Sequence, residues 1–336
     1  MQGKSVYAAA PNVIEVRTVE VDEKSLTPKQ MLVKTRYSVI SPGTELDCLS
    51  GREASWFHIP APLGYCATTE VIAVGEAVSS YAVGDYVLSA TPHATYGIVD
   101  EEWTRGKVPE GLDLKLSPLT HMALISITAL RNATAELGDY AVVIGQGLVG
   151  NLAAQFFRAQ GCRVIAVDRL ASRLEISQRC GIELTVDASQ GEAVQAVKDL
   201  TGGAGAEIVV EATGAAPAAL MGAEMAARNG EMILLGTPRG GYEADVIPLL
   251  RAVHRNAPNL TLKGAHGGSI RALPDPYVKH SLVRNARLVM DMIRRKELQL
   301  APLVSRVVKP DQAPEAYQTL REQPEKLLGV IFDWTA

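Results

Sequence analysis

The stretch GQGLVG places glycines at positions 145, 147 and 150, the spacing of a loop that binds a dinucleotide. It directly follows the apolar run YAVVI and opens the helix-like run LVGNLAAQFFRAQG. Gly145 permits a tight turn, Gly147 lets backbone N–H groups approach a pyrophosphate, and Gly150 lets helix and strand pack closely. Leu148 and Val149 begin the helix, whose N-terminus carries partial positive charge. These residues therefore predict a pyrophosphate-binding turn.

A carboxylate follows at the distance where such a site recognises a ribose. Asp168 ends the next apolar run, CRVIAVD, and can accept hydrogen bonds from both ribose hydroxyls of the adenosine half. It would repel a 2′-phosphate, so NAD is predicted over NADP. Arg169 and Arg173 lie close behind and leave NADP open, since a nearby arginine can accommodate that phosphate. A simpler alternative is that Asp168 only caps the helix near LASRLE.

The elements around this turn predict a parallel sheet. From about residue 118, four apolar runs (YAVVIG, CRVIAVD, AEIVVEATG and GEMILLG) are each followed by 12 to 20 residues of helical spacing. That alternation predicts an α/β domain of the Rossmann type, a doubly wound parallel sheet, over residues 118–268. Residues 1–117 carry short β-branched runs separated by glycine and proline, which indicates a β-rich unit. Residues 269–336 are expected to return to that unit.

Composition narrows the class of protein. At 336 residues with 47% hydrophobic and 21% charged residues, the chain has the length of two globular domains. A net charge of -4 without basic runs argues against nucleic acid as a partner and favours a small molecule. Four scattered cysteines, no secretory signal and no membrane span predict a cytoplasmic protein.

Several motifs together resemble the medium-chain dehydrogenase/reductase family, the alcohol dehydrogenase-like fold, over nearly the whole chain. They recur in that family's order and spacing, and they read SPGTELDCLSG (41–51), PLGYCATTEVIAVG (62–75), VGDYVL (83–88), GDYAVVIGQGLVG (138–150), VVEATG (209–214), LLGTP (234–238) and APEAYQTL (313–320). The resemblance implies that the β-rich unit is a GroES-like catalytic domain into which the dinucleotide domain is inserted. It also implies a homodimer formed through the edge strand TLKGAHGG (261–268).

The resemblance fails at the zinc positions. Zinc-dependent members have Cys-Gly-Thr-Asp where this chain has PGTE (42–45), and Gly-His-Glu where it has GYC (64–66). Proline and tyrosine cannot replace thiolate and imidazole in a tetrahedral zinc site, and no cysteine lies between Val87 and Val108 for a structural zinc. We therefore expect no zinc. A different metal arrangement of Cys66, Glu45, His93 and His121 stays open.

The SPGTE motif resembles a zinc-free branch that includes bacteriochlorophyllide hydroxyethyl dehydrogenase and cyclitol and sugar dehydrogenases. In this comparison Tyr65 occupies the position of the zinc-bound histidine, and Glu45 occupies the position of the residue that orients this histidine. Thr44 corresponds to the residue whose hydroxyl relays the proton. His121 lies near the first turn of the central helix, and its ordinary pKa makes it the best proton acceptor. The expected acid/base is His121, then Glu45, then Tyr65, with Glu45 in contact with either Tyr65 or a water molecule.

Each candidate also has a purely structural interpretation. His121 could be a buried or capping histidine, Glu45 could accept backbone N–H groups in its turn, and Tyr65 could be core packing. Cys66 is expected to be inert packing. The loop SGREASWFHIP (50–60) is expected to face the substrate through Trp56, Phe57 and His58, or to be a packed surface loop, and His93 is a weaker substrate candidate.

The resemblance also implies residues on the nicotinamide side, namely Thr213, Gly236, Thr237, Gly264 and Ala265. The expected function is a zinc-independent, NAD-dependent oxidoreductase that interconverts a secondary alcohol and a ketone, with a sugar or cyclitol as substrate. Three alternatives remain at this stage. They are a reductase of a conjugated C=C bond or a quinone, a bacteriochlorophyllide-type hydroxyethyl dehydrogenase, and a protein that binds the dinucleotide without turnover.

Overall fold

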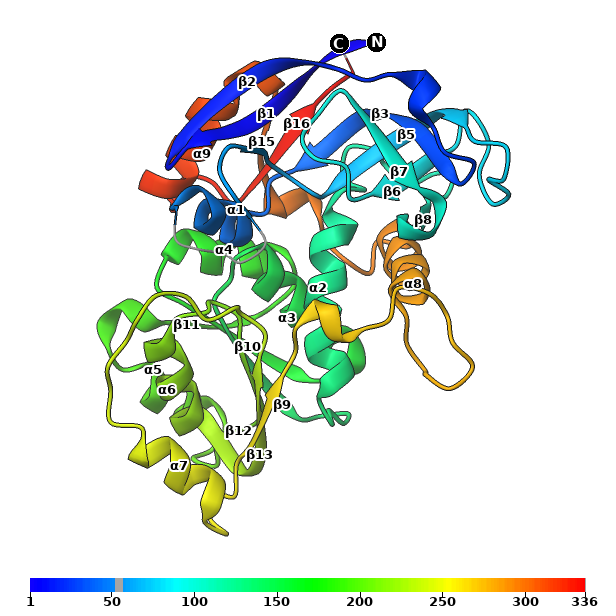
Figure 1. The fold of residues 1–336 in the computed structure, drawn as a ribbon. Helices are drawn as coiled ribbons and strands as arrows, with labels where there is room; N and C mark the ends of the chain where they lie inside the picture. Colours follow the sequence, from blue (N-terminus) through cyan, green and yellow to red (C-terminus); the bar gives the residue numbers. More distant parts are fainter. Residues whose placement is uncertain (52–56, 336) are drawn as a thin grey trace. The chain divides into compact units, whose positions relative to one another are not determined.

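The computed structural model describes residues 1–51 and 57–335, which fall into two compact units (Figure 1). The first unit comprises Met1–Met122, Arg271–Arg295 and the residues from 303 onwards, and the second comprises Ala123–Ile270 and Lys296–Pro302. The predicted division differs at three places, because it assigned residues 118–122, 269–270 and 296–302 to the other domain.

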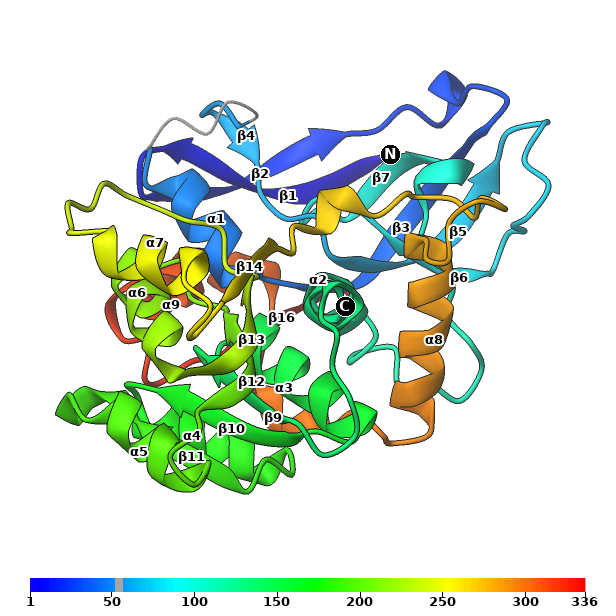
Figure 2. The same ribbon diagram turned by 90° about the horizontal axis from the view of Figure 1, so that it is seen from below.

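The second unit is built on a parallel six-stranded sheet, as predicted. Its strand order is β11-β10-β9-β12-β13-β14, and every neighbouring pair is parallel. Figure 2 shows β10, β9, β12 and β13 side by side. The order reverses beside β9, so the first glycine turn lies at the switch point where such sheets bind ligands. The strands are β9 (Tyr140–Ile144), β10 (Arg163–Asp168), β11 (Leu184–Asp187), β12 (Ala206–Glu211), β13 (Ala226–Leu234) and β14 (Thr261–Gly264).

The central strands β9, β10 and β12 are mostly apolar because helices cover both faces of the sheet. Ala141 and Val143 of β9 belong to one buried cluster, whereas Val142 and Ile144 belong to another on the opposite face. The covering helices are α2 (Leu119–Asn132), whose first turn belongs to the first unit, α3 (Leu148–Gln160), α4 (Ala171–Arg179), α5 (Ala193–Leu200), α6 (Ala216–Met225) and α7 (Ile247–His254).

A buried polar chain explains why residues 296–302 belong to the second unit. Gln155 on α3 accepts a hydrogen bond from the backbone N–H of Gln299 at 2.7 Å and donates to its carbonyl at 3.2 Å. Gln155 also donates to Asn151, and Asn151 donates to Ser177 on α4. All three side chains are fully buried, so each needs these partners. Sequence periodicity could not indicate such a pairing between distant residues.

The first unit contains two sheets. A three-stranded sheet has the order β2-β1-β4, and a larger one has the order β15-β16-β3-β5-β6-β8, with β7 also pairing with β3. The strands are β1 (Gln2–Ala10), β2 (Val13–Glu20), β3 (Gln30–Val39), β4 (Ala61–Pro62), β5 (Ala67–Val74), β6 (Tyr86–Ser89), β7 (Tyr96–Asp100), β8 (Gly106–Lys107), β15 (Val304–Val308) and β16 (Gly329–Asp333). The C-terminal segment thus completes a sheet begun near the N-terminus.

Helices α1 (Pro42–Leu49), α8 (Leu282–Arg294) and α9 (Ala313–Glu322) complete the first unit. In the first unit, short 3₁₀ turns occur at 23–25, 101–103 and 310–312, and in the second unit at 188–190 and 267–269. A further turn, 301–303, has residues in both units. Aromatic side chains of α9 and β16, Tyr317 and Phe332, are fully buried together with Leu63 and Ile40. Of the helices in the described ranges, none has the length and apolar character needed to span a membrane.

Candidate functional site

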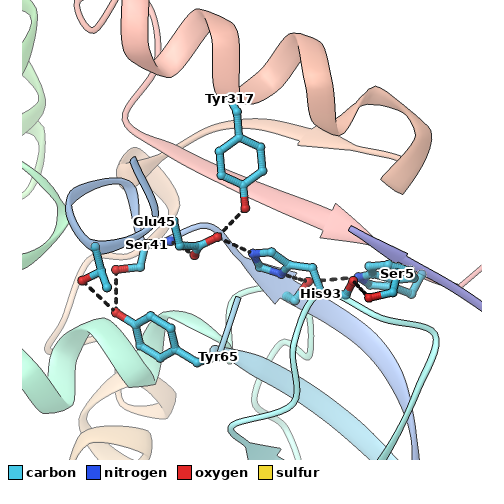
Figure 3. A network of polar contacts seen from close by, with 9 residues as sticks. Ser5, Ser41, Glu45, Tyr65, His93 and Tyr317 are labelled. Carbon is cyan, nitrogen blue, oxygen red and sulfur yellow. Dashed lines mark hydrogen bonds and ion pairs between the residues drawn. The ribbon is translucent and has the colours of Figure 1, made fainter. Parts of the chain in front are cut away.

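The carboxylate of Glu45 is the centre of a buried network in the first unit (Figure 3). Its side chain lies on α1, and the residue is only 2% exposed. Oε1 accepts a hydrogen bond from the Ser41 backbone N–H at 2.7 Å, while Oε2 contacts His93 Nε2 at 3.1 Å and accepts from the Tyr317 hydroxyl. A buried carboxylate is costly unless it is hydrogen-bonded, and these three partners come from three separate segments.

The network continues beyond His93. Its Nδ1 lies 2.8 Å from Ser38 Oγ, and Trp334 Nε1 donates to the same oxygen at 2.9 Å. Because an indole N–H can only donate, the hydroxyl of Ser38 is available to donate to Nδ1. His93 Nε2 then carries the proton that it donates to Glu45. This assignment satisfies every group in the chain from Trp334 to Glu45 with a neutral imidazole.

Gly64 makes room for this histidine. A Cβ at Gly64 would lie 2.5 Å from the imidazole carbon Cδ2 of His93, and the φ angle of Gly64 is +91°. The backbone holds His93 in place as well, since its N–H donates to Leu63 and its carbonyl accepts from Val6. Gly64 of the PLGYC stretch therefore leaves room for the imidazole of His93. His93 was a candidate for substrate contact, but its side chain is fully buried.

Tyr65 points to the other side of Ser41 (Figure 3). Its hydroxyl lies 2.7 Å from Ser41 Oγ and 3.4 Å from Thr44 Oγ1. Burial raises the pKa of Tyr65 far above neutrality, so the phenol stays protonated. The expected Glu45–Tyr65 hydrogen bond is not formed, because the Glu45 oxygens are occupied by Ser41, His93 and Tyr317. Tyr65 and Thr44 are brought together instead.

His121 lies in the first turn of α2 and is 6% exposed. Burial, and then the positive charge of Arg105, lower the pKa of its imidazole to about 4, while the carbonyls of Ala67 and Ser89 act in the opposite direction. The ring is therefore neutral at pH 7. Among the described residues, Nε2 has no hydrogen-bond partner. A buried lone pair without a partner is what a ligand hydroxyl could satisfy.

The residues near the expected zinc positions do not fit that metal. Glu45 and both ring nitrogens of His93 are already hydrogen-bonded within the protein. Burial raises the pKa of Cys66 well above its ordinary value, whereas zinc binds a thiolate. No group of three metal-ligating side chains occurs within residues 1–51 and 57–335. Pro42 and Tyr65 supply no replacement ligand.

The expected substrate loop is only partly described. Trp56 lies outside the described residues, and His58 is exposed. Phe57 and Ile59 pack against the buried cluster that contains Leu63 and Tyr317. In this structure Phe57 is thus part of the core rather than a projecting contact.

The glycine turn of the second unit has the geometry of a phosphate-binding loop. Gly145 has a φ of +91°, and a Cβ at Gly150 would lie 1.8 Å from the carbonyl oxygen of Gly145. By contrast, a Cβ at Gly147 would meet nothing within 4 Å, so the backbone is open to a ligand there. Gly147 caps α3 with extended backbone, and Leu148 and Val149 follow in its first turn. The turn fits a pyrophosphate.

Asp168 at the end of β10 lies beside this turn. Its Oδ2 accepts from the Gln146 backbone N–H at 2.6 Å and its Oδ1 from the Leu170 N–H at 2.9 Å. The N-cap of α4 is Leu170, not Asp168, so simple capping does not describe it. Each oxygen keeps acceptor capacity for a ribose hydroxyl.

The two arginines behind Asp168 differ. Arg169 is exposed. Arg173 is partly buried; burial lowers the pKa of its guanidinium, and the negative charge of Asp168 acts in the opposite direction.

Thr213 lies at the same edge of the sheet, after β12. Glu211 holds it, because a Glu211 oxygen accepts from the backbone N–H of Thr213 at 2.6 Å and from its hydroxyl. The Gly214 N–H donates to the same carboxylate. A Cβ at Gly145 would lie 2.5 Å from the methyl group of Thr213, so the turns after β9 and β12 touch.

The remaining predicted cofactor residues follow β13 and β14. A Cβ at Gly236 would lie 2.2 Å from the Gly214 nitrogen, and one at Gly214 would lie 2.1 Å from the Thr237 carbonyl oxygen. Gly264 ends β14, and the Ala265 N–H donates to Leu234 at 2.9 Å. The turns after four strands are therefore assembled at one edge of the sheet.

Sequence reasoning missed Tyr317, Ser41 and Glu211. Tyr317 was visible in the motif APEAYQTL, but it lies 272 residues from Glu45 and nothing local pairs the two. Glu211 had a local signal, since an acidic residue at the end of an apolar strand before Thr-Gly can accept the N–H groups of the turn.

Comparison with known proteins is consistent with this geometry. Residues 149–280 match the family model described as "Zinc-binding dehydrogenase". The chain is 26% identical over 360 residues to D-guloside 3-dehydrogenase of Escherichia coli K12, covering 98% of this chain and 100% of that one. It is 25% identical to sorbitol dehydrogenase of Halalkalibacterium halodurans, covering 62% of this chain and 69% of that protein.

Two solved structures share the fold. Galactitol-1-phosphate dehydrogenase from Escherichia coli superposes with a TM-score of 0.85 at 18% identity, covering 98% of this chain and 99% of that one. A structure from Sinorhizobium meliloti 1021 bound to NADP gives 0.83 at 21% identity, with 99% of each chain covered. At these identities the likeness shows the fold alone.

Replacing Tyr317 by phenylalanine tests the network around Glu45. The Tyr317→Phe variant removes one donor from a buried carboxylate, so we expect a loss of about 1–3 kcal/mol in the free energy of unfolding. Tyr277 is 94% exposed, and Tyr277→Phe is the matched control. Urea unfolding followed by tryptophan fluorescence measures both. Equal transition midpoints for the two variants would show that the hydroxyl does not stabilise the carboxylate.

Proposed function

Because the chain belongs to the alcohol dehydrogenase-like family of medium-chain dehydrogenases and reductases, we propose that it interconverts a secondary alcohol and a ketone without zinc, using NAD. It is an oxidoreductase acting on CH–OH groups. Relatives named for a guloside and for sorbitol support a polyol, sugar or cyclitol as the substrate. The proposal depends most on one observation, the buried Nε2 of His121, which forms no hydrogen bond with any described residue.

The second unit would hold the cofactor through the groups assembled at the edge of its sheet. Gly147 and the first turn of α3 would bind the pyrophosphate, and Asp168 the ribose hydroxyls. When bound, the nicotinamide supplies hydride acceptance. Thr213 is held in one orientation by Glu211, which suits a residue that lines the cofactor.

Residues of the first unit would handle the hydroxyl proton. The low pKa of His121 keeps its imidazole unprotonated over the neutral range, so Nε2 is available to accept a hydrogen bond from the substrate hydroxyl. The same low pKa makes it a weak base, which leaves the alkoxide in need of further stabilisation. Tyr65 stays protonated and acts as a hydrogen-bonding hydroxyl beside Thr44.

The chemistry of the candidate ligands supports the proposed zinc independence. Glu45 and His93 already bind each other, and Cys66 is held as a thiol by burial. Glu45 and His93, which could otherwise replace missing zinc ligands, are therefore already hydrogen-bonded within the protein.

Substitution of His121 tests the reaction. His121→Gln keeps a polar group but cannot accept the proton, so kcat for polyol oxidation should fall about 100-fold. Reduction of NAD at 340 nm across sugars, polyols and cyclitols measures it, with the exposed His254→Gln as control. The protein should contain less than 0.1 zinc per chain by metal analysis, an order-of-magnitude threshold for a metal not held by a built site.

Three outcomes would count against this function. Turnover that depends on one tightly bound zinc would overturn zinc independence. Reduction of quinones or enones unaffected by His121→Gln would favour the reductase alternative. Binding of NAD without turnover of any substrate would favour a binding protein.

Asp168 should set the preference for NAD. Asp168→Asn removes the negative charge that repels a 2′-phosphate, so the ratio of kcat/KM for NADP to that for NAD should rise at least about tenfold. Asp187 ends the neighbouring strand β11 and is exposed, which makes Asp187→Asn a matched control. An unchanged ratio in Asp168→Asn would mean that Arg169 and Arg173 decide the cofactor.

A homodimer is proposed from the edge of the same sheet. Strand β14 pairs with β13 on one side, and beside it lie exposed apolar side chains, with Leu262 at 42%, Leu250 at 56% and Val253 at 40%. An unpaired apolar edge strand favours pairing with a second copy. Light scattering should give twice the 35.9 kDa chain mass. Leu262→Lys should shift the protein towards monomer, whereas Val13→Lys in the first unit should not.

A further inference from the structure

Arg105 is a positive charge in the first unit that the proposed function has not used. It directly precedes β8, and its backbone N–H donates to Leu88 of β6 at 2.9 Å. The strand register pairs Leu88 with Gly106, so Ser89 lies opposite Arg105. Ser89 in turn pairs with Ala67 of β5. Arg105 thus lies opposite Ser89, one of the two residues whose backbone groups hydrogen-bond to His121.

The guanidinium is partly buried without a carboxylate partner. In the described part of the chain, its side chain makes one polar contact, from Nη1 to the Trp103 carbonyl at 3.3 Å, and no ion pair. Several other arginines in this unit are paired with carboxylates, as Arg36 is with Glu70 at 3.2 Å. Partly buried arginine usually has an anionic partner. An arginine with five donors and one acceptor retains capacity for an oxygen ligand.

We propose that Arg105 supplies the positive charge that stabilises the alkoxide oxygen of the substrate, and thereby replaces the electrostatic function of a metal. This inference rests on the proposed alcohol dehydrogenase function. It extends that function by naming a residue that lies outside every motif of the family resemblance. The substrates that this inference concerns are secondary alcohols whose hydroxyl reaches His121, whether or not they carry a charge.

The charge of Arg105 affects the pKa values of two neighbouring groups, His121 and Cys66. The charge lowers the pKa of His121, because a second positive charge there is unfavourable. It also lowers the pKa of Cys66 against the larger effects of burial and Glu45, because an anion there is stabilised. Among the charged side chains of the described residues, Arg105 affects the pKa of His121, whereas both Glu45 and Arg105 affect the pKa of Cys66. A field that stabilises a thiolate also stabilises an alkoxide.

The reaction balances with these groups. The O–H bond of the alcohol would break as its proton passes to Nε2 of His121. The carbinol C–H bond would break with its electron pair, and a bound nicotinamide would supply the hydride acceptor. The carbon–oxygen double bond of the ketone forms from the O–H electron pair. In the reverse direction the ketone oxygen gains negative charge and then the proton. In both directions the charge develops on one oxygen, where a guanidinium in a partly desolvated site is effective.

The two residues would therefore divide the work that a zinc ion does alone. His121 accepts the proton but is a weak base because of Arg105 and burial. Arg105 compensates by lowering the free energy of the alkoxide itself. A guanidinium stays protonated at any working pH, so its charge is constant across the pH profile.

Nuclear magnetic resonance of the full-length protein tests the field without turnover. The His121 imidazole should titrate near pH 4 in the wild type. In Arg105→Met its pKa should move upwards towards 6.5, whereas Arg36→Met, which removes a paired guanidinium of the same unit, should leave it unchanged. Arg105→Gln provides a second variant if the first does not fold. An unchanged His121 pKa in folded Arg105 variants would overturn the inference.

Kinetics test the role on the substrate. Arg105→Met should lower kcat for a neutral polyol about 100-fold or more, and Arg105→Lys should recover part of it by restoring the charge. A change confined to KM for phosphorylated or carboxylated polyols would overturn the alkoxide role and assign Arg105 to anchoring an acidic substrate. If no alcohol is oxidised by the wild type, the proposed function fails. If the wild type is active and Arg105→Met is equally active, only this inference fails.

Discussion

The buried carboxylate of Glu45 is the interaction on which the first unit depends. Its oxygens accept hydrogen bonds from the start of α1, from His93 before β7 and from Tyr317 on α9. Because a carboxylate inside a protein is tolerated only with such donors, these segments cannot move apart independently. The chain extends through Ser38 to Trp334, so the C-terminal strand is tied to the same group.

The second unit uses carboxylates in a related way, but at the edge of a sheet. Asp168 accepts the N–H of Gln146 in the glycine turn, and Glu211 accepts the N–H groups of Thr213 and Gly214. In each case a side chain at the end of a parallel strand fixes the backbone of the adjoining turn. Turns that would otherwise be mobile are therefore preorganised where this class of sheet binds its ligands.

The structural role of Glu45 distinguishes it from the residues that are proposed to take part in the chemistry. Glu45 and His93, both considered from the sequence as possible catalytic or substrate groups, satisfy each other and are withdrawn from a ligand. His121 differs because its Nε2 forms no hydrogen bond with any described residue. The proposed site would rely on a neutral imidazole and on the guanidinium of Arg105. Its electrostatics come from side chains held in a partly desolvated place, where charges act strongly.

The sequence by itself determined the features that depend on near neighbours. The parallel sheet, the glycine turn at Gly145 and the carboxylate at Asp168 could all be predicted, because apolar periodicity and turn chemistry are properties of short segments. Only the tertiary structure decided that Tyr317 rather than Tyr65 binds Glu45, and that the charge of Arg105 acts on the His121 imidazole. Those contacts join residues far apart in the chain, and a side chain carries no local signal of its distant partner. Their selection depends on how strands and helices pack once the fold has formed.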